Sequence, residues 1–151
     1  MNERKIVSMN SLCLWVFLLL VVLGTKGEAK VRVEVMNRLG GGRRLSIHCR
    51  SGDDDLGYHS LEEEREMAWS FSPNIWATTL FYCEVRWDGC GSDWKSFDAY
   101  DEQRDYWRCS SRCLWMINKE GSLYGYDEED RYWQWFPFSE YSSSQHHLPP
   151  N

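Results

Sequence analysis

Apolar and polar residues alternate in short runs along most of the chain beyond residue 30. In 45–50 the odd-numbered residues are apolar and the even-numbered ones, His48 among them, are polar, and 79–87 shows much the same pattern over a longer stretch. A period of two predicts strands with one buried face, and it puts His48 on the solvent side of its strand. The other predicted strands are 31–36, 67–71, 113–117, 122–126 and 131–136.

Turn-forming residues separate these runs. Three consecutive glycines at 40–42 predict a tight turn, so 31–36 and 45–50 are expected to pair as a hairpin. The strand at 113–117 has apolar residues on both faces, which indicates a central place in a sheet. No stretch predicts a long helix. The expected fold class is therefore all-β, a small antiparallel β-sandwich of about seven to eight strands.

The first 29 residues differ from the rest. A short charged start is followed by an apolar run of 12 residues at 12–23, and small or polar residues lead up to Ala29. This order predicts a secretory signal peptide at 1–29, cleaved after Ala29. A membrane-spanning helix needs about 20 apolar residues, so no membrane insertion is expected after cleavage. One domain at 30–138 and a flexible tail at 139–151 would remain.

The chain is acidic, with 23 Asp and Glu against 17 Lys and Arg and a formal net charge of -6. This balance argues against nucleic acid as a partner. Aromatic residues make up 15% of the chain, which is enough for large rings to build a core in a short β protein.

Outside the predicted leader the chain has five cysteines: Cys49, Cys83, Cys90, Cys109 and Cys113. In a secreted protein such residues are expected to form disulfides, and an odd number leaves one unpaired within the chain. Bridges between distant strands constrain the unfolded chain most. The predicted bonds therefore join Cys49 and Cys83 each to a cysteine of the 109–113 segment, with the choice between the two open. Cys90 is the expected free thiol.

Several segments, in order along the chain, resemble signature motifs of the plant self-incompatibility protein homologue family. They are His-Cys-Arg-Ser-Gly-Asp-Asp-Asp-Leu-Gly at 48–57, Trp-Ser-Phe at 69–71, Thr-Leu-Phe-Tyr-Cys at 79–83, Phe-Asp-Ala-Tyr-Asp at 97–101, and 109–115 with Gly121. The family consists of small secreted plant proteins, and its founding members are stigma-side determinants that reject self pollen. The resemblance implies a β-sandwich, two disulfides among the four matching cysteines, and a ligand-like role in place of catalysis. Those cysteines are Cys49, Cys83, Cys109 and Cys113.

On this basis the chain is expected to be a secreted, non-enzymatic ligand in the apoplast. It would signal to a plant cell-surface receptor, as a monomer and without a cofactor. Binding would use polar loops presented by a rigid scaffold, and the predicted loops are 51–57, 88–95 and 98–105. The candidate contact residues in them are Asp53, Asp54, Asp55, Asp88, Asp93 and Arg104.

Two other functions compete with this one. A small secreted hydrolase could use His48 and His59 with the nearby aspartates, but no spacing in the chain predicts a nucleophile or an oxyanion donor. An apoplastic defence protein could bind glycans through Trp133 or Trp135, since flat rings stack on sugars and anchor interfaces. Neither has a complete residue pattern in its favour.

Two possible metal sites are also incomplete. The aspartates at 53–55 lack the alternating acids and the closing glutamate of a calcium loop, so they are expected to cap a turn or to remain solvated. Cys109 and Cys113 lack the second pair of ligands that a zinc site needs. No metal is therefore expected.

Overall fold

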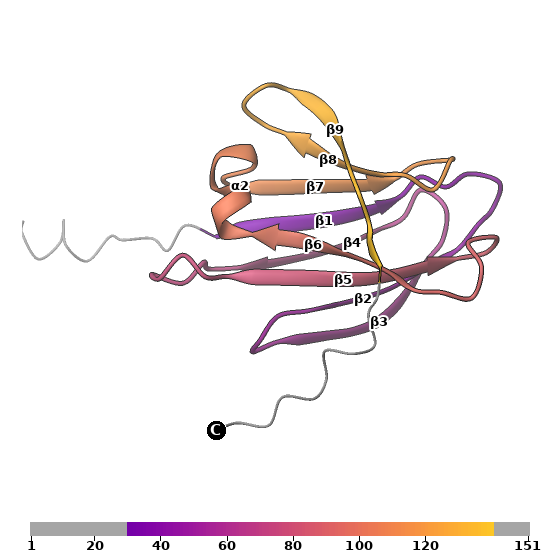
Figure 1. Ribbon diagram of the computed structural model, residues 1–151, viewed down its shortest axis with the longest axis horizontal. Coiled ribbons are helices and arrows are strands. Elements are labelled where there is room, and N and C mark those ends of the chain that lie inside the picture. Colours follow the sequence, from indigo (N-terminus) through magenta and orange to yellow (C-terminus); the bar gives the residue numbers. More distant parts are fainter. Residues whose placement is uncertain (1–29, 141–151) are drawn as a thin grey trace, which may run out of the picture.

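The computed structural model describes residues 30–140, which form two packed β-sheets and one short helix (Figure 1). The predicted signal peptide at 1–29 and the tail beyond residue 140 lie outside the described residues. Within 30–140, no helix has the length and apolar character needed to cross a membrane. The elements are β1 (Val31–Asn37), β2 (Leu45–Arg50), β3 (Asp55–Leu61), β4 (Glu66–Phe71), β5 (Leu80–Trp87), β6 (Lys95–Asp101), α2 (Glu102–Arg108), β7 (Arg112–Ile117), β8 (Leu123–Asp127), β9 (Tyr132–Phe136) and β10 (Ser139–Glu140).

The described strands form two five-stranded sheets. The first sheet has the order β4-β1-β7-β8-β9 and the second has the order β10-β6-β5-β2-β3. Neighbours are antiparallel except for β1 and β7, which pair in parallel. The predicted all-β sandwich is confirmed, with ten strands in the described part where about seven to eight were expected. β7 is the central strand of the first sheet, as its two apolar faces predicted.

The core lies between the two sheets around Trp115 of β7. Its ring is fully buried, and its Nε1 donates a hydrogen bond of 2.7 Å to the carbonyl of Ala99 on β6, which links the two sheets. The ring centroids of Phe97 and Phe136 lie 5.3 and 4.9 Å from that of Trp115. Aliphatic side chains from both sheets complete the core: Val33, Val35, Leu45, Ile47, Val85, Ile117 and Leu123.

The predicted hairpin between the first two strands is wrong, because β1 and β2 belong to different sheets. The chain does turn at 40–42, where all three glycines have positive φ, but the turn carries it from one sheet to the other. Leu39 is fully buried at this crossing. Beside it, Asn37 donates from Nδ2 to the carbonyls of Arg43 and Leu61. Burial of the connection therefore determines where β2 lies, and turn composition alone does not report burial.

The structure has two disulfides among the four expected cysteines, but the predicted pairing is wrong. Cys49 bonds to Cys83, its direct neighbour in register on β5, and Cys109 bonds to Cys113. The prediction was based on how strongly each bond would restrict the unfolded chain. Which bonds form depends instead on which cysteine side chains meet in the folded protein. Cys49 and Cys83 meet within the second sheet, and the other two close the short connection from α2 to β7. Cys90 is unbonded and half-buried.

Three further segments differ from the sequence analysis. The acidic loop expected at 51–57 is shorter, because residues from Asp55 onward form the edge strand β3, whose mostly exposed side chains show no alternation. The loop expected at 98–105 is not a loop, because β6 extends to Asp101 and residues 102–108, where no helix was predicted, form α2. Ser139 and Glu140, which the sequence analysis assigned to the tail, pair with β6 as β10.

Replacing Gly125 by alanine is expected to lower the free energy of unfolding by about 1–3 kcal/mol, the usual cost of overpacking a core. A Cβ at this position of β8 would lie 2.9 Å from Arg108 Nη1 and equally close to the rings of Phe136 and Trp115. Urea unfolding checks this, with Gly52→Ala as the control, because a Cβ there meets nothing within 4 Å. An unchanged unfolding midpoint for Gly125→Ala would contradict this packing.

Candidate functional site

The loop between β4 and β5 presents two large apolar side chains to solvent. Asn74 shapes this loop, since its Oδ1 accepts hydrogen bonds from the backbone N–H groups of Trp76 (3.0 Å) and Thr78 (3.1 Å). Its own backbone N–H donates to Thr79 Oγ1 at 2.8 Å. Side-chain bonds of this kind hold a loop that has no regular structure. Ile75 and Trp76 remain 89% and 78% exposed.

Helix α2 follows β6 directly and presents two more rings. Asp101 caps it, because its side chain accepts a hydrogen bond from the backbone of the first turn. The backbone N–H of Glu102 donates to the carbonyl of Thr79 at 3.1 Å, which ties the start of the helix to the loop between β4 and β5. On the exposed side of α2, the rings of Tyr106 and Trp107 lie edge to face with centroids 4.9 Å apart.

These exposed side chains, together with Leu80 at the start of β5, lie at the end of the sandwich where α2 lies. We call this group of side chains the apolar end patch, and its residues are Ile75, Trp76, Leu80, Tyr106 and Trp107. Ile75 and Tyr106 line the same hollow of about 340 Å³. A second hollow of about 520 Å³, beside Leu80, is bordered by Asp53 and Asp54 from the turn between β2 and β3. Among the described residues, the charged groups that line the two hollows are acidic, namely Asp53, Asp54 and Glu102.

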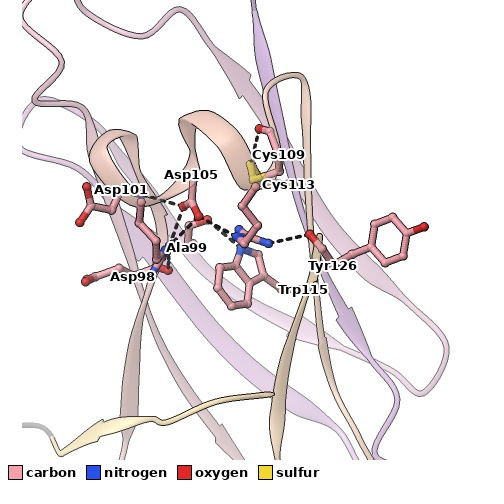
Figure 2. The surroundings of a disulfide bond; sticks show 10 residues. Asp98, Ala99, Asp101, Asp105, Cys109, Cys113, Trp115 and Tyr126 are labelled. Carbon is pink, nitrogen blue, oxygen red and sulfur yellow. Dashed lines mark hydrogen bonds and ion pairs between the residues drawn. A yellow bond between two sulfur atoms is a disulfide. The ribbon is translucent and has the colours of Figure 1, made fainter. Parts of the chain in front are cut away.

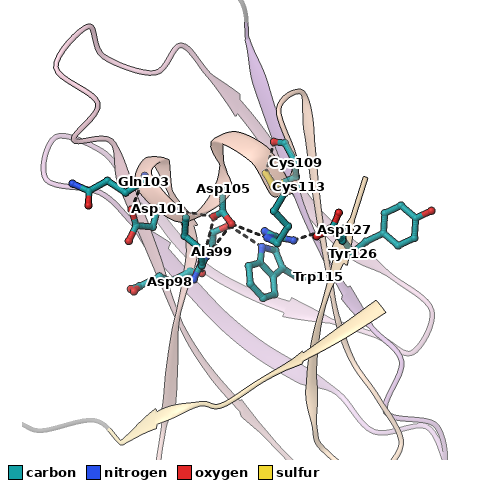
Figure 3. A network of polar contacts seen from close by, with 12 residues as sticks. Asp98, Ala99, Asp101, Gln103, Asp105, Cys109, Cys113, Trp115, Tyr126 and Asp127 are labelled. Atoms are coloured by element: carbon teal, nitrogen blue, oxygen red, sulfur yellow. Dashed lines mark hydrogen bonds and ion pairs between the residues drawn. A yellow bond between two sulfur atoms is a disulfide. The ribbon is translucent and has the colours of Figure 1, made fainter. Parts of the chain in front are cut away.

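Beneath the apolar end patch, α2 is held by a buried carboxylate between two arginines, close to the Cys109–Cys113 disulfide (Figure 2). Asp105 is fully buried and accepts hydrogen bonds from Arg104 Nη2 at 2.6 Å and Arg108 Nε at 2.7 Å. Arg108 also donates from Nη1 to the carbonyl of Tyr126 at 2.8 Å. The network therefore connects α2 to β8 in the first sheet (Figure 3).

The charges of this network stabilise one another. Burial alone would raise the pKa of Asp105, but the hydrogen bond from Arg104 and the positive charges of Arg108 and Arg104 outweigh it, so its pKa lies below the ordinary value of 3.8. Both guanidinium groups also lie over the ring of Trp115, at 5.2 Å for Arg104 and 4.5 Å for Arg108. Arg104, a predicted contact residue, is thus committed to holding α2 on the core.

The structure separates the predicted binding loops. Because Leu80 at the start of β5 pairs with Asp101 at the end of β6, the segment at 98–105, which is the end of β6 and the start of α2, lies at the same end as the apolar end patch. Asp53 and Asp54 lie there too. The loop at 88–95 follows the other end of β5, so Asp88 and Asp93 lie at the opposite end of the second sheet. The three loops do not form one surface.

His48 is hydrogen-bonded and largely buried, with only 4% of its surface exposed. It points to the outer face of the second sheet as predicted, but Tyr58 of β3 covers its ring at 4.1 Å between centroids. Its Nε2 lies 2.6 Å from Asp55 Oδ1. The pKa of Asp55 lies below its ordinary value. The main cause is the hydrogen bond from the backbone N–H of Gly57, and the second is the hydrogen bond with His48. Asp55 is therefore engaged within the protein.

The sequence analysis did not identify the apolar end patch. Ile75 and Trp76 follow Pro73 in a stretch without alternation, and Tyr106 and Trp107 lie in a segment rich in charged residues. A usable signal is present, namely large apolar side chains in segments that no strand pattern can bury. Their exposure depends on the tertiary fold, so composition alone does not reveal it.

Comparisons with known proteins all point to one plant protein family. The family described as "Plant self-incompatibility protein S1" matches residues 32–137. The "Self-incompatibility protein S1" of Papaver rhoeas is 43% identical over 106 residues, which cover 69% of this chain and 73% of that protein. "S-protein homolog 5" of Arabidopsis thaliana is 45% identical over 92 residues, covering 61% of this chain and 69% of the homolog.

A solved structure of Self-Incompatibility Protein Homologue proteins, described as small, highly stable, secreted proteins from plants, has a similar fold. The TM-score is 0.56 with 23% sequence identity, and the match covers 72% of this chain and 96% of the solved chain. At this identity the likeness concerns the arrangement of the strands. It agrees with the two-sheet sandwich described above.

Proposed function

Because this chain belongs to the plant self-incompatibility protein S1 family, we propose that it is a secreted, non-enzymatic recognition protein that binds a protein on the surface of a plant cell. The apolar end patch is the binding surface in this proposal. The apoplast is the compartment, and the chain acts there as a monomeric ligand that needs no cofactor.

The exposure of the apolar end patch is the observation that carries the proposal. Large apolar side chains that gather on one surface are typical of interaction sites, and Trp and Tyr dominate the binding energy of many interfaces. Trp76 and Trp107 both lie in segments that hydrogen bonds, a helix cap and a buried ion network hold in place. A surface that is ordered before binding loses less conformational entropy when the partner arrives.

The positions of the two histidines support a role without catalysis. His48 lies beneath Tyr58 on the outer face of the second sheet. His59 pairs in register with Ile47, so it belongs to the opposite face, and its Nε2 contacts the carbonyl of Leu56 at 2.9 Å. The two imidazoles therefore cannot act on one substrate, as the hydrolase alternative requires.

Replacing Trp76 and Trp107 together by serine is expected to weaken saturable binding of the labelled protein to plant plasma-membrane vesicles by about 30-fold or more. The reason is that the double variant removes the two largest rings of the apolar end patch. Trp135→Ser is the matched control, because Trp135 is an exposed tryptophan on β9 in the first sheet. Vesicles treated with protease should lose the binding.

Other outcomes separate the alternatives. Unchanged binding by the Trp76 and Trp107 double variant would overturn the proposal that the apolar end patch is the binding surface. The glycan-binding alternative would be favoured if Trp135→Ser lost binding and if the parent protein still bound vesicles treated with protease. Thermal melts of all variants serve as the control for unfolding. The melting temperatures should stay close to that of the parent, because Trp76 and Trp107 are largely exposed and contribute little to the core.

A further inference from the structure

The outer face of the second sheet carries a polar row at the end opposite the apolar end patch. Ser60 on β3, Ser46 on β2 and Arg86 on β5 are direct register partners across three neighbouring strands. Side chains that face each other in such pairs lie about 5 Å apart. The three strands lie together in the lower layer of Figure 1. Neither serine hydroxyl has a hydrogen bond to another group of residues 30–140.

Arg86 differs from the arginines around it because its guanidinium group has no carboxylate partner among the described residues. Arg44 pairs with Glu62 at 3.0 Å, and Arg50 pairs with Glu84 at 3.2 Å. Arg86 instead lies over the ring of Trp94, at 5.0 Å from its centroid. Stacking on a ring orients the guanidinium plane and leaves its N–H groups free. Such a group suits a planar carboxylate, which it binds through two parallel hydrogen bonds.

A hollow of about 360 Å³ lies over this row. Arg86, Ser46 and Ser60 line it together with Asp88 from the loop between β5 and β6. Arg44 lines it as well, but its guanidinium group is paired with Glu62. The hydroxyls can donate to or accept from ligand hydroxyls, and the carboxylate of Asp88 can accept from them. The lining therefore combines one free cation with several groups that suit a ligand rich in hydroxyls.

An open aromatic ring lies next to the hollow. Tyr58 is 73% exposed although one side of its ring stacks on His48, so its other side faces solvent. Tyr58 and Trp94 form a T-shaped pair with their centroids 6.0 Å apart, so Trp94 links Tyr58 to Arg86. Apolar C–H faces of sugars pack on rings of this kind. Tyr58 and Arg86 belong to strands that flank β2, about 10 Å apart, so one ligand that contacts both must be longer than a single sugar.

We propose that this surface, formed by Arg86, Ser46, Ser60, Asp88, Trp94 and Tyr58, binds an acidic oligosaccharide. A carboxylate of the ligand pairs with Arg86, a sugar ring packs on Tyr58, and the serines and Asp88 bind ligand hydroxyls. The surface lies at the other end of the second sheet from the apolar end patch, so its failure as a site would leave the proposed recognition function unaffected.

Calorimetric titration of the secreted protein with a linear trimer of galacturonic acid tests the proposal, at about 0.15 M salt, where exposed charges are screened beyond ~8 Å. The trimer should bind, and Arg86→Gln should weaken binding about tenfold or more because the bidentate pair is lost. Arg131→Gln is the control, since it removes the same charge from an exposed residue between β8 and β9. Amide shifts in the NMR spectrum should concentrate at Ser46, Ser60 and the loop at 88–95.

Five outcomes would overturn the proposal. The trimer could fail to bind, or Arg86→Gln and Arg131→Gln could weaken binding equally, which would indicate a diffuse charge effect. The same trimer with its carboxylates reduced to alcohols could bind as well, which would show that Arg86 recognises no anion. A hexaglutamate peptide could bind as tightly, which would show that the surface takes acidic peptides. Tyr58→Ala, which keeps Arg86 intact, should also weaken trimer binding, and an unchanged affinity would exclude the sugar contact.

Discussion

Replacing Asp105 by alanine is expected to lower the free energy of unfolding by about 3–5 kcal/mol, the cost of breaking a buried ion pair by removing one partner. The change leaves Arg104 and Arg108 next to each other without the carboxylate between them, and Arg108 is itself buried. It also removes the acceptor of the Asp101 backbone N–H. Because small domains are stable by only about 5–15 kcal/mol in total, a large part of the stability depends on this one side chain.

The asparagine variant measures the same effect in a protein that keeps the shape of the side chain. The folded-state pKa of Asp105 is lowered below 3.8, so its charge contributes fully above the unfolded-state pKa and is lost as pH falls through the folded value. Asp105→Asn should therefore be less stable than the parent at pH 7, and the difference should shrink below about pH 4. Urea unfolding across this pH range makes the measurement.

Asp130→Asn is the matched control, because Asp130 is an exposed aspartate in the turn between β8 and β9. It should change the stability by less than about 0.5 kcal/mol at any pH, as surface substitutions usually do. A difference between Asp105→Asn and the parent that persists unchanged at low pH would contradict the assignment of the effect to the charge of Asp105.

The second large effect is expected from the Cys49–Cys83 disulfide. Replacing both cysteines by alanine should lower the free energy of unfolding by about 4 kcal/mol, whereas replacing Cys109 and Cys113 should lower it by about 2 kcal/mol. The reason is that the first bond closes a loop with a sequence separation of 34 residues and the second one of only 4, so they restrict the unfolded chain to different extents.

Urea unfolding of the two double variants without reductant makes this comparison. Peptide mapping of the unreduced parent should recover Cys49 linked to Cys83 and Cys109 linked to Cys113, with Cys90 as a thiol. Equal losses of stability in the two variants would contradict the loop-entropy account. A bond between Cys49 and the 109–113 segment would contradict the pairing in the structure.

Individual strands were predictable because the physical cause is local. Alternation over 79–87 corresponds to β5, and the apolar residues on both faces of 113–117 correspond to the central strand β7. Successive side chains of a strand point to opposite faces of the sheet whatever its neighbours are, so the alternation can be recognised without knowledge of the fold. The ordered motifs likewise identified the family, because their spacing is a property of the chain.

Strand partners were less predictable, because pairing depends on contacts between residues distant in sequence. The turn at 40–42 was expected to return β2 onto β1, but burial of Leu39 takes it to the other sheet. The edge strand β3 has no alternating pattern, so the side chain that covers the outward-facing His48 was not predicted. In the structure, Tyr58 of that strand covers His48. One missed strand therefore hid the burial of His48 from the sequence analysis.

Some features of this protein follow from the sequence alone, and others only from the tertiary structure. By itself the sequence determined the all-β class and the cysteines that form disulfides. Only the tertiary structure decided that Cys49 faces Cys83, that Arg104 and Arg108 enclose Asp105, and which large side chains stay exposed. The physical reason is that local periodicity is encoded in neighbouring residues, whereas burial and pairing arise when the two sheets pack together.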